Sequence, residues 1–526
     1  MDSLEKVLGL TAVVLLVAMM AIRVSKKAGL PSMLLYLIMG MALGNAGLGI
    51  DFSNALLTEY LGLGALVLIL AEGGLTTRWN NVKPALGLGI SLATVAVIVS
   101  IGVAGLGVHL LMGYDWRTSL LWGAVLSSTD AAAVFSVLRG VPVLRRVAAS
   151  LELESGLNDA PVVLAVLLLA GTQDITWTAP LLVVFELFAG AVVGLAIGFG
   201  GAWWLRRIAL PAGGLYPLAT MALIVGAYTA GGLAHGSGFL AVYVCSLILG
   251  NSSLPHRANT LGFAEGLGWL AQIGLFVLLG LYADPHRLPE MLLPGLLIGL
   301  WLLLVARPLS VFAATAPFKI PWREQVFLSW SGLRGAVPIV LAMIPLVYGR
   351  DTAQDLVDLM LVVVIVYTLL QGTSLAWLAR KLGVLEVVAP HEVQIEASTL
   401  DRMKAHVLQI AVPMDSKLHG VYLSELRLPP STTIALVLRD GAPLQVAPTV
   451  RLQYGDEFLV VAPENVRAAT ERRLRAVGRA GPLAGWFTRP VVRDAVVGVE
   501  PSVRRRPRPR PRRGSTRDVG DGPPTV

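Results

Sequence analysis

The sequence is poor in charged residues and has almost no cysteine. Only 14% of its 526 residues are Asp, Glu, Lys or Arg, whereas an average soluble domain has about 25%. Apolar residues make up 55% of the chain, and the mean hydropathy is +0.70. The single cysteine, Cys245, lies in an apolar run and has no partner for an internal disulfide. These features exclude a soluble globular enzyme, a disordered chain and a disulfide-stabilised fold.

Several motifs that carry chemistry in other proteins are also missing. The sequence has no HExxH zinc motif and no paired Ser/His arrangement, which argues against an intramembrane enzyme. It has no segment like TVGYG, which argues against a potassium-channel filter. The N-terminus, MDSLEK, has no basic region and no small-residue cleavage site before its apolar stretch. We therefore interpret that stretch as a first membrane span and not as a removed signal peptide.

Long apolar stretches fill residues 1–389. A hydrocarbon core of about 30 Å needs about 20 apolar residues per helix, and such stretches follow one another through this region. We predict an all-α polytopic membrane protein with about thirteen transmembrane helices, near residues 4–22, 30–48, 54–72, 84–112, 118–138, 147–171, 177–205, 215–234, 237–250, 260–282, 289–315, 324–348 and 354–380.

Basic residues in the loops predict the orientation of these spans. Lys and Arg accumulate in cytoplasmic loops. One set of alternate loops carries fifteen of them, and the other set carries four, which are Lys6, Arg117, Arg287 and Arg350. The split predicts an odd number of spans in the cell membrane, with the N-terminus outside and the C-terminus in the cytoplasm.

Two predicted spans are interrupted by polar residues. SSTD (127–130) breaks the stretch 118–138, and SWSGLRGAVP (329–338) breaks the stretch 324–348. If the chain is divided into six, one and six helices, these are the fifth helix of each half. Interrupted helices at matching positions indicate inverted repeats and a binding site near the membrane midplane, where unwound backbone faces an ion.

Acidic residues at membrane depth mark the candidate site. A carboxylate there costs about 2.5–3.5 kcal/mol on insertion scales, so each one is a functional candidate. Asp130 lies in the first interruption, and LELESGLNDAPVVL (151–164) places Glu154, Ser155, Asn158 and Asp159 on adjacent faces of one helical turn. Such a group of oxygens suits a hard monovalent cation. The alternative is that these residues cap helix ends in the headgroup region.

Other charged residues in apolar runs leave alternatives open. Glu72, at the end of the third span, is either part of the site or an interfacial carboxylate. Arg334, inside the second interruption, must pair with an acid such as Glu154 unless it extends to the interface. Arg307 and Glu186 are interpreted as interfacial or packing residues.

The pattern changes after residue 390. Short alternating apolar segments predict a small cytoplasmic α+β domain with a strand over 406–412, a helix over 416–426, a hairpin over 433–444, a strand over 455–463 and a helix over 464–474. This region has no GxGxxG, so a bound dinucleotide is not indicated. We predict a transmembrane domain over 1–385, a linker over 386–399, the α+β domain over 400–475 and a disordered Arg/Pro-rich tail over 476–526.

The net charge of +8 resides in the tail. Residues 472–526 hold fourteen basic and four acidic residues, whereas residues 1–389 hold 21 basic and 20 acidic ones. Each basic residue near anionic lipid is worth about 1 kcal/mol. We therefore expect the tail to contact the inner leaflet, and we expect no nucleic-acid partner.

Four segments together resemble the signatures of the cation:proton antiporter superfamily. They are LAEGGL (70–75), SSTDAAAVFSVLRG (127–140), ESGLNDAPVVL (154–164) and SGLRGAVPIVLA (331–342). In their order and spacing they are most similar to the NhaP-type branch and its cell-volume-regulation (CvrA-like) potassium/proton antiporters, over about residues 1–385. Residues 400–475 separately resemble the TrkA-C (RCK-C) module of potassium-conductance regulators.

This resemblance implies an NhaA-like fold and a set of cation ligands. The fold has inverted repeats with two broken helices that cross. Asp159 would be the carboxylate that binds both the ion and the proton, and Thr129, Asp130 and Ser155 would be further cation ligands. Ala131 follows Asp130 at a position where the family often has proline, which leaves the local geometry open.

The resemblance also implies supporting residues and a stoichiometry. Asn158 and Glu72 would be the polar pair that positions the site, and Glu154 and Arg334 would form a buried salt bridge. The electrogenic branch has Asp-Asp where this chain has Asn158 and Asp159. The implied function is therefore electroneutral exchange of K⁺ for H⁺ by competition at Asp159 with alternating access, in a homodimer.

Two alternatives to K⁺/H⁺ exchange remain at this point. Sodium/proton exchange is the nearest, because no spacing distinguishes K⁺ from Na⁺. A cation channel gated by an RCK-type module belongs to another class. No cofactor is expected apart from the transported ions, and a regulatory nucleotide or cyclic dinucleotide on 400–475 is implied by the resemblance alone.

Overall fold

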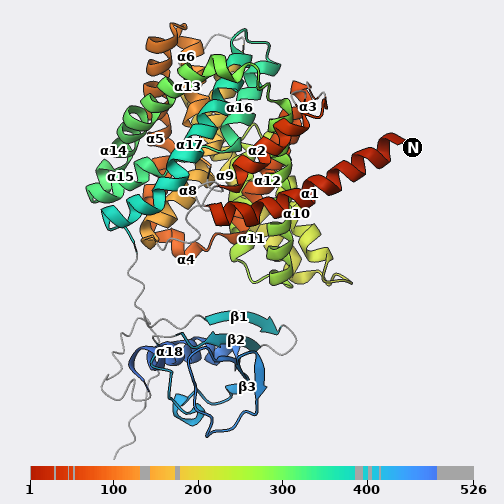
Figure 1. Ribbon diagram of the computed structural model, residues 1–526, viewed down its shortest axis with the longest axis vertical. Coiled ribbons are helices and arrows are strands. Elements are labelled where there is room, and N and C mark those ends of the chain that lie inside the picture. The colour runs from red at the N-terminus through yellow and green to blue at the C-terminus, as the bar shows by residue number, and fades with distance from the viewer. Residues whose placement is uncertain are drawn as a thin grey trace, which may run out of the picture.

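The computed structural model describes residues 2–28, 31–44, 47–50, 52, 54–130, 143–171, 178–385, 395–400, 405–413 and 416–481. These residues form a large body of helices and a smaller unit of strands with one helix (Figure 1). The predicted combination of a mostly helical membrane protein with a small α+β domain is confirmed.

Helices occupy the apolar stretches that were expected to span the membrane. They are α1 (Asp2–Ala28), α2 (Ser32–Leu43), α3 (Ala55–Thr76), α4 (Trp79–Val82), α5 (Leu86–Met112), α6 (Trp116–Ser127), α8 (Arg145–Ala170), α9 (Ala179–Arg207), α10 (Leu215–Leu233), α11 (Gly238–Asn251), α12 (Arg257–Tyr282), α13 (Leu288–Trp301), α14 (Arg307–Thr315), α15 (Trp322–Trp330), α16 (Ala336–Val347) and α17 (Ala353–Leu382). In the described residues, eight helical segments are long and apolar enough to cross a membrane, and four apolar helices are shorter.

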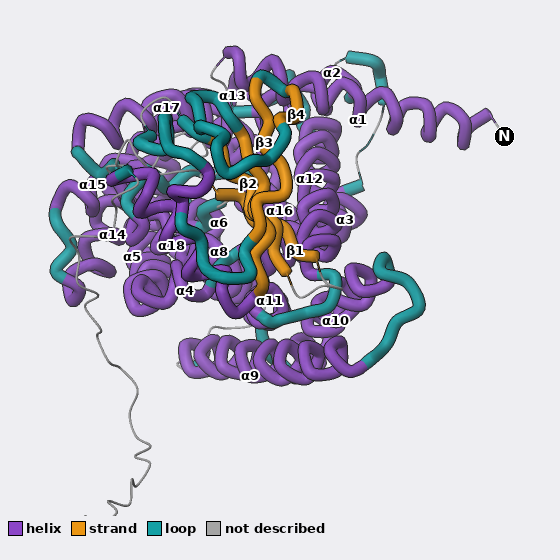
Figure 2. Tube along the Cα trace, turned by 90° about the horizontal axis from the view of Figure 1, so that it is seen from below, coloured by secondary structure: helices purple, strands orange, loops and turns teal. Residues whose placement is uncertain are grey.

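The helices fall into two groups that meet along α8 and α16. Helices α5, α6, α8 and α13 to α17 pack on one another, and α2, α3 and α9 to α12 form the second group (Figure 2). Contacts of α3 and α12 with α16, and of α11 with α8, join the groups. Small residues allow close approach within a group, since a Cβ atom at Gly40 of α2 would lie 2.8 Å from Gly280 Cα of α12.

The predicted interruptions are present where the structure describes them. Helix α15 ends at Trp330 and α16 begins at Ala336, so the second interruption is confirmed. Helix α6 ends at Ser127 and residues 128–130 are not helical, whereas residues 131–142 lie outside the described part of the chain. The backbone N–H of Asp130 donates to Leu333 O at 3.0 Å, so the two interruptions touch.

The C-terminal unit is an antiparallel sheet that is closed by one helix. Its strands are β1 (Ile395–Leu400), β2 (Ala405–Ala411), β3 (Thr433–Arg439), β4 (Ala442–Leu444) and β5 (Glu457–Pro463), in the order β1-β2-β5-β3-β4, and the helix is α18 (Glu464–Ala480). The predicted strands, hairpin and closing helix are confirmed. Asp440 and Gly441 both have positive φ, at 51° and 77°, as a two-residue hairpin turn requires.

Two sequence-based predictions for this unit are wrong. The expected helix over 416–426 is a run of turns that ends in a short 3₁₀ helix, Leu423–Leu426. Gly420 has φ of +84°, and its N–H donates to Leu452 O at 2.7 Å, so a long-range bond replaces the helical one. The expected linker over 386–399 contains most of β1, which pairs with β2 and thus belongs to the sheet.

Candidate functional site

Four polar residues lie close together on α8. Glu154, Ser155, Asn158 and Asp159 are all buried. They lie in the middle of a helix that runs from residue 145 to residue 170. The alternative that they cap helix ends is therefore wrong.

Three hydrogen bonds join this part of α8 to residues 128–130. Ser128 Oγ donates to Asp159 Oδ1 at 3.1 Å, and Ser155 Oγ donates to Thr129 O at 3.0 Å. Asn158 Nδ2 donates to Thr129 Oγ1 at 2.6 Å. The structure thus brings together Thr129, Ser155, Asn158 and Asp159, which the sequence placed in one site.

Asp130 lies where the two interruptions cross. It is buried, and its backbone is bonded to Leu333 of the second interruption. An ideal Cβ atom at Gly335 would overlap the Asp130 carboxylate. Only glycine at position 335 lets the backbone of the second interruption pass this close to the carboxylate.

The buried ion pair differs from the predicted one. Glu154 Oε1 lies 2.5 Å from Arg307 Nη1, and both side chains are buried. Arg334 Nη1 instead donates to Ser128 O, and Arg334 is close enough to Glu154 only for a longer electrostatic interaction. The predicted Glu154–Arg334 bridge is wrong, as is the interpretation of Arg307 as an interfacial or packing residue.

Local backbone geometry brings Arg307 to Glu154. A π-helical turn, Leu302–Ala306, separates α13 from α14, and Arg307 follows it directly. Such turns occur often at functional sites, because they shift the face on which the next residues lie. The sequence signal was an arginine followed by Pro308 in an apolar run, which by itself does not identify a partner.

We expect Arg307→Met to destabilise the protein strongly. The substitution leaves Glu154 buried without its partner, which costs about 3–5 kcal/mol of the free energy of unfolding. Thermal unfolding of the detergent-purified protein measures the loss. Arg467→Met is the control, since Arg467 pairs with Glu471 at 2.9 Å with both side chains partly exposed, and such surface pairs are worth about 1 kcal/mol or less. Equal losses in the two variants would contradict this expectation.

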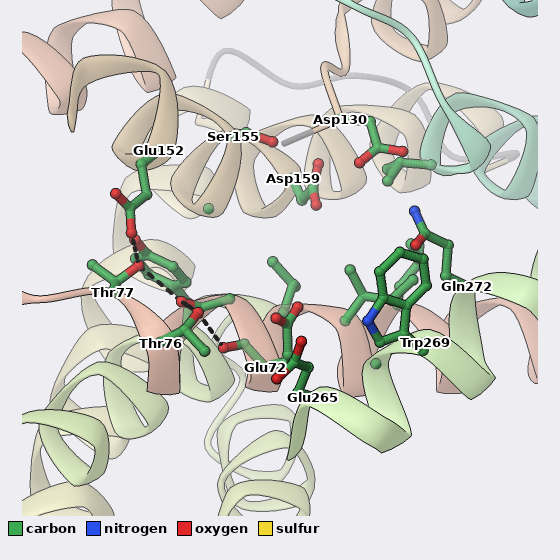
Figure 3. Close-up of a pocket in the computed structure, with 18 of the residues that line it drawn as sticks. Glu72, Thr76, Thr77, Asp130, Glu152, Ser155, Asp159, Glu265, Trp269 and Gln272 are labelled. Atoms are coloured by element: carbon green, nitrogen blue, oxygen red, sulfur yellow. Dashed lines mark hydrogen bonds between the residues drawn. The ribbon is translucent and has the colours of Figure 1, made fainter. Parts of the chain in front are cut away.

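A cavity of about 390 Å³ lies beside the site, between the two groups of helices. Figure 3 shows Asp130 and Asp159 on one wall, and Glu72 of α3 and Glu265 of α12 on the opposite wall. Glu152 also lines the cavity and accepts a hydrogen bond from Thr77 Oγ1. No lysine or arginine is found among the described residues that line it, so every charged residue of this lining is acidic.

Glu72 lines the same cavity as Asp159. It lies across the cavity from Asp159 and packs against Gly268 of α12. Its pairing with Asn158 stays a prediction. Glu265 was missed because it is a single acid in a long helix, and Glu152 because its bonding partner Thr77 lies in a distant segment. The signal that could have found Glu152 is its position three residues before Ser155 on the same helix.

The C-terminal unit carries a smaller polar cluster at its surface. The rings of His419 and Tyr454 are stacked at 3.8 Å between centroids and 7° between planes. Arg451 Nε donates to Gly420 O at 2.8 Å, beside the ring of Tyr422. The described residues contain no group of three His, Cys, Asp or Glu side chains that could hold a metal ion.

The chain matches two known families in consecutive segments. Residues 12–381 match the family described as sodium/hydrogen exchanger, transmembrane. Residues 407–475 match the TrkA-C domain family.

Curated relatives match most of the chain. It is 36% identical to the K(+)/H(+) antiporter NhaP of Alkalimonas amylolytica over 454 residues, which are 84% of this chain and 78% of that protein. It is 35% identical to the K(+)/H(+) antiporter NhaP2 of Shewanella sp. (strain MR-4) over 477 residues, 88% of this chain and 82% of that protein. The Na(+)/H(+) antiporter ApNhaP of Aphanothece halophytica is 29% identical over 432 residues, 77% of this chain and 81% of that protein.

A solved structure shares the helical fold. The sodium proton antiporter MjNhaP1 from Methanocaldococcus jannaschii at pH 8 superposes with a TM-score of 0.63 and 22% identity. The match covers 72% of this chain and 99% of that one. At this level of identity the likeness shows the fold alone.

Proposed function

The chain belongs to the sodium/hydrogen exchanger family and is a secondary transporter, and on this premise we propose that it exchanges K⁺ for H⁺ across the bacterial cytoplasmic membrane. The observation that carries the proposal is the buried Asp159, bonded to Ser128 at the crossing of two interrupted helices and open to an acidic cavity. The names of the relatives at 35–36% identity favour K⁺, as does the TrkA-C unit. Na⁺/H⁺ exchange is the second candidate, favoured by the name of the relative at 29% identity.

We propose thirteen membrane crossings arranged as inverted repeats, with the N-terminus outside. The contact between Asp130 and Leu333 supports this arrangement, since it makes the two interruptions cross as the repeats require. Three of the four basic residues assigned to external loops have structural partners. Arg287 pairs with Asp355 and Asp358, and Arg117 and Arg350 bond to the end of α8. The positions of these three arginines are therefore explained by their partners and are compatible with external loops.

Competition at Asp159 would couple the two ion flows. The carboxylate can hold either a proton or a dehydrated cation, and Thr129, Asp130 and Ser155 offer further oxygens beside it. A neutralised site crosses the low-dielectric barrier more cheaply than a charged one. An empty, charged site would stay in place, which makes exchange obligatory. The helices that pack with α8 would move against the helices that pack with α3 and α12.

The described conformation is interpreted as open to the cytoplasm. The cavity reaches Thr77 and Glu152, which lie near the ends of α3 and α8 that carry Arg78 and Arg145. These arginines are in loops assigned to the cytoplasm by the charge rule. A cation would thus enter from the cytoplasmic side in this state.

The neutral neighbour of Asp159 supports the one-for-one exchange that the resemblance implies. Asn158 cannot titrate, and its amide already donates to Thr129. The site then has one carboxylate on α8 that exchanges a single charge per cycle. We therefore propose electroneutral transport.

Further proposals concern partners and regulation. A homodimer is proposed from the family resemblance, and the arginine-rich tail is proposed to contact anionic lipid. The predicted start of this tail is wrong, because residues 476–480 belong to α18, and residues 482–526 lie outside the described part of the chain. A nucleotide or cyclic dinucleotide is proposed as regulator of the C-terminal unit. The stacked His419 and Tyr454 rings support this, together with Arg451, which bonds to the neighbouring Gly420, since they offer a planar face and a cation.

The test is exchange in proteoliposomes that contain the full chain. A pH-sensitive dye inside energised vesicles reports proton movement when K⁺ or Na⁺ is added. We expect a K⁺-dependent signal that is unchanged when a permeant anion such as thiocyanate collapses the membrane potential. A larger response to Na⁺ would favour the second candidate, and cation flux without proton movement would favour a channel.

We expect Glu265→Gln to weaken the binding of cations from solution without lowering the maximal rate of exchange. The cavity concentrates cations because five carboxylates line it, and removing one should raise the apparent KM about two- to threefold at low ionic strength. Dye assays at several K⁺ and salt concentrations measure the change. Glu290→Gln, an exposed charge at the start of α13, is the control and should leave KM unaltered. Equal KM values in the two variants would show that the cavity charge is irrelevant.

A further inference from the structure

We propose that Arg117 and Arg350 are positioning residues that fix the position of α8 along its axis relative to both interrupted helices. In this way they hold the cation ligands of α8 and of residues 128–130 together. The inference rests on the proposed exchange at Asp159 and adds two residues that lie far from that carboxylate along the helix. Neither arginine belongs to the segments that carry the family resemblance.

Both arginines bond to the last carbonyl groups of α8. Arg117 Nε donates to Leu169 O at 3.1 Å, and its Nη2 donates to Gly171 O. Arg350 Nε donates to Ala170 O at 2.9 Å, and its Nη2 donates to Leu169 O at 3.4 Å and to Gly171 O. The last carbonyls of a helix have no partner within it and carry partial negative charge. Two forked cations at one helix end therefore make a strong, directional clamp.

The two arginines come from the two interrupted helices. Arg117 is the second residue of α6, and Arg350 follows α16 by three positions. Gly349, at φ of +70°, turns the chain after α16, so that Arg350 N–H bonds back to Pro345 O at 3.1 Å. Each half-helix thus begins or ends at the clamp on α8.

The opposite ends of these helices meet at the ion site. Helix α6 has 12 residues and leads to Ser128, and α16 has 12 residues and begins beside Gly335 and Asp130. On α8, Asn158 and Ala170 are also 12 positions apart. At 1.5 Å per residue all three rods are about 18 Å long. They form a frame that is joined by the arginines at one end and by the site at the other.

This frame matters more for the binding of the cation than for the binding of the proton. Cation binding needs oxygens of α8 and of residues 128–130 at the same time, whereas a proton needs only the Asp159 carboxylate. If the clamp loosens, the two ligand sets can move apart. Cation affinity then falls while proton affinity is largely kept.

The test uses Arg117→Gln, Arg350→Gln and the corresponding lysine variants of the full chain in proteoliposomes. We expect the KM for K⁺ to rise about tenfold in each glutamine variant, because hydrogen bonds from a charged group are lost. Lysine offers a single point of charge instead of a fork, so its effect should be about two- to fivefold. The maximal rate at saturating K⁺ should stay within about twofold of the parent value.

A second readout separates positioning from a merely structural role. At subsaturating K⁺ the acidic limb of the pH profile should move to higher pH by about one unit. The reason is that a cation that binds tenfold more weakly competes equally with protons only when the proton concentration is tenfold lower. A structural role would lower the maximal rate and leave KM and the pH profile in place. Arg206→Gln is the control, because Arg206 also donates Nε to a helix carbonyl, Ala202 O of α9, away from the site.

Unchanged KM in all variants overturns the inference, and so does a loss of rate without a change in KM or pH profile. If the glutamine variants are not recovered as folded protein, an unchanged KM in the lysine variants overturns it. Absence of K⁺-dependent proton movement in the parent chain would instead contradict the proposed function, so the two failures are distinguishable.

Discussion

Asp159→Asn is expected to reduce K⁺-dependent proton movement to the level of empty vesicles, with the fold retained. The amide has nearly the same shape and can still accept the hydrogen bond from Ser128 Oγ, which lies 3.1 Å from Asp159 Oδ1. It can hold neither a proton to be exchanged nor the charge that attracts a cation. Dye assays in proteoliposomes measure exchange, and gel filtration with thermal unfolding measures the fold.

A matched substitution controls for the change from acid to amide. Asp440→Asn makes the same replacement in the β3–β4 turn, where Asp440 has positive φ. Asparagine suits such a turn, so exchange and stability should both be kept. Substantial exchange in Asp159→Asn, at the level of this control, would remove Asp159 from the transport site.

Gly335→Ala is expected to abolish exchange by displacing Asp130. The added methyl group would overlap the Asp130 carboxylate at the crossing of the two interruptions. Either the carboxylate or the backbone must move, at a cost of about 1–3 kcal/mol as for other overpacked sites. We therefore expect lost exchange and a lower unfolding temperature, each measured as for Asp159→Asn.

The control is a glycine with space around it. Gly102 lies in the middle of α5, and nothing stands within 4 Å of its ideal Cβ position. Alanine there favours the helix by about 1 kcal/mol, so Gly102→Ala should keep exchange and stability. Adding Asp130→Ala to Gly335→Ala should restore stability but not exchange. If the double variant stays as unstable as the single one, overlap with Asp130 is not the cause.

Local spacing was enough to locate most of the ion site. Ser155 and Asp159 are four residues apart on one helix, and so are Glu154 and Asn158, so any helix over 151–164 places their side chains together. The interruptions were visible because SSTD and SGLRG are polar segments in apolar runs. Such segments are tolerated at membrane depth only where they line a protein-enclosed site.

Contacts between distant segments could not be predicted in the same way. Glu154 was paired with Arg334 in the sequence analysis, because the spacing of residues on one helix does not say which other helix lies beside it. The π-helical turn before Arg307 decides the pairing, and it depends on how α14 packs against α5 and α15. The segment 416–426 has a helical pattern, yet bonds from Gly420 to Leu452 override it.

The sequence by itself determined that the first part of the chain is a mostly helical membrane domain, since hydrocarbon accepts only backbone that satisfies its own hydrogen bonds. It also determined the two interruptions and the polar turn of α8, which are local patterns. The tertiary structure alone decided that Arg307 pairs with Glu154, that Glu152 and Glu265 complete an acidic cavity, and that Arg117 and Arg350 meet at the end of α8. These contacts join residues that are far apart in the chain, and their geometry follows from helix packing, which no local periodicity specifies.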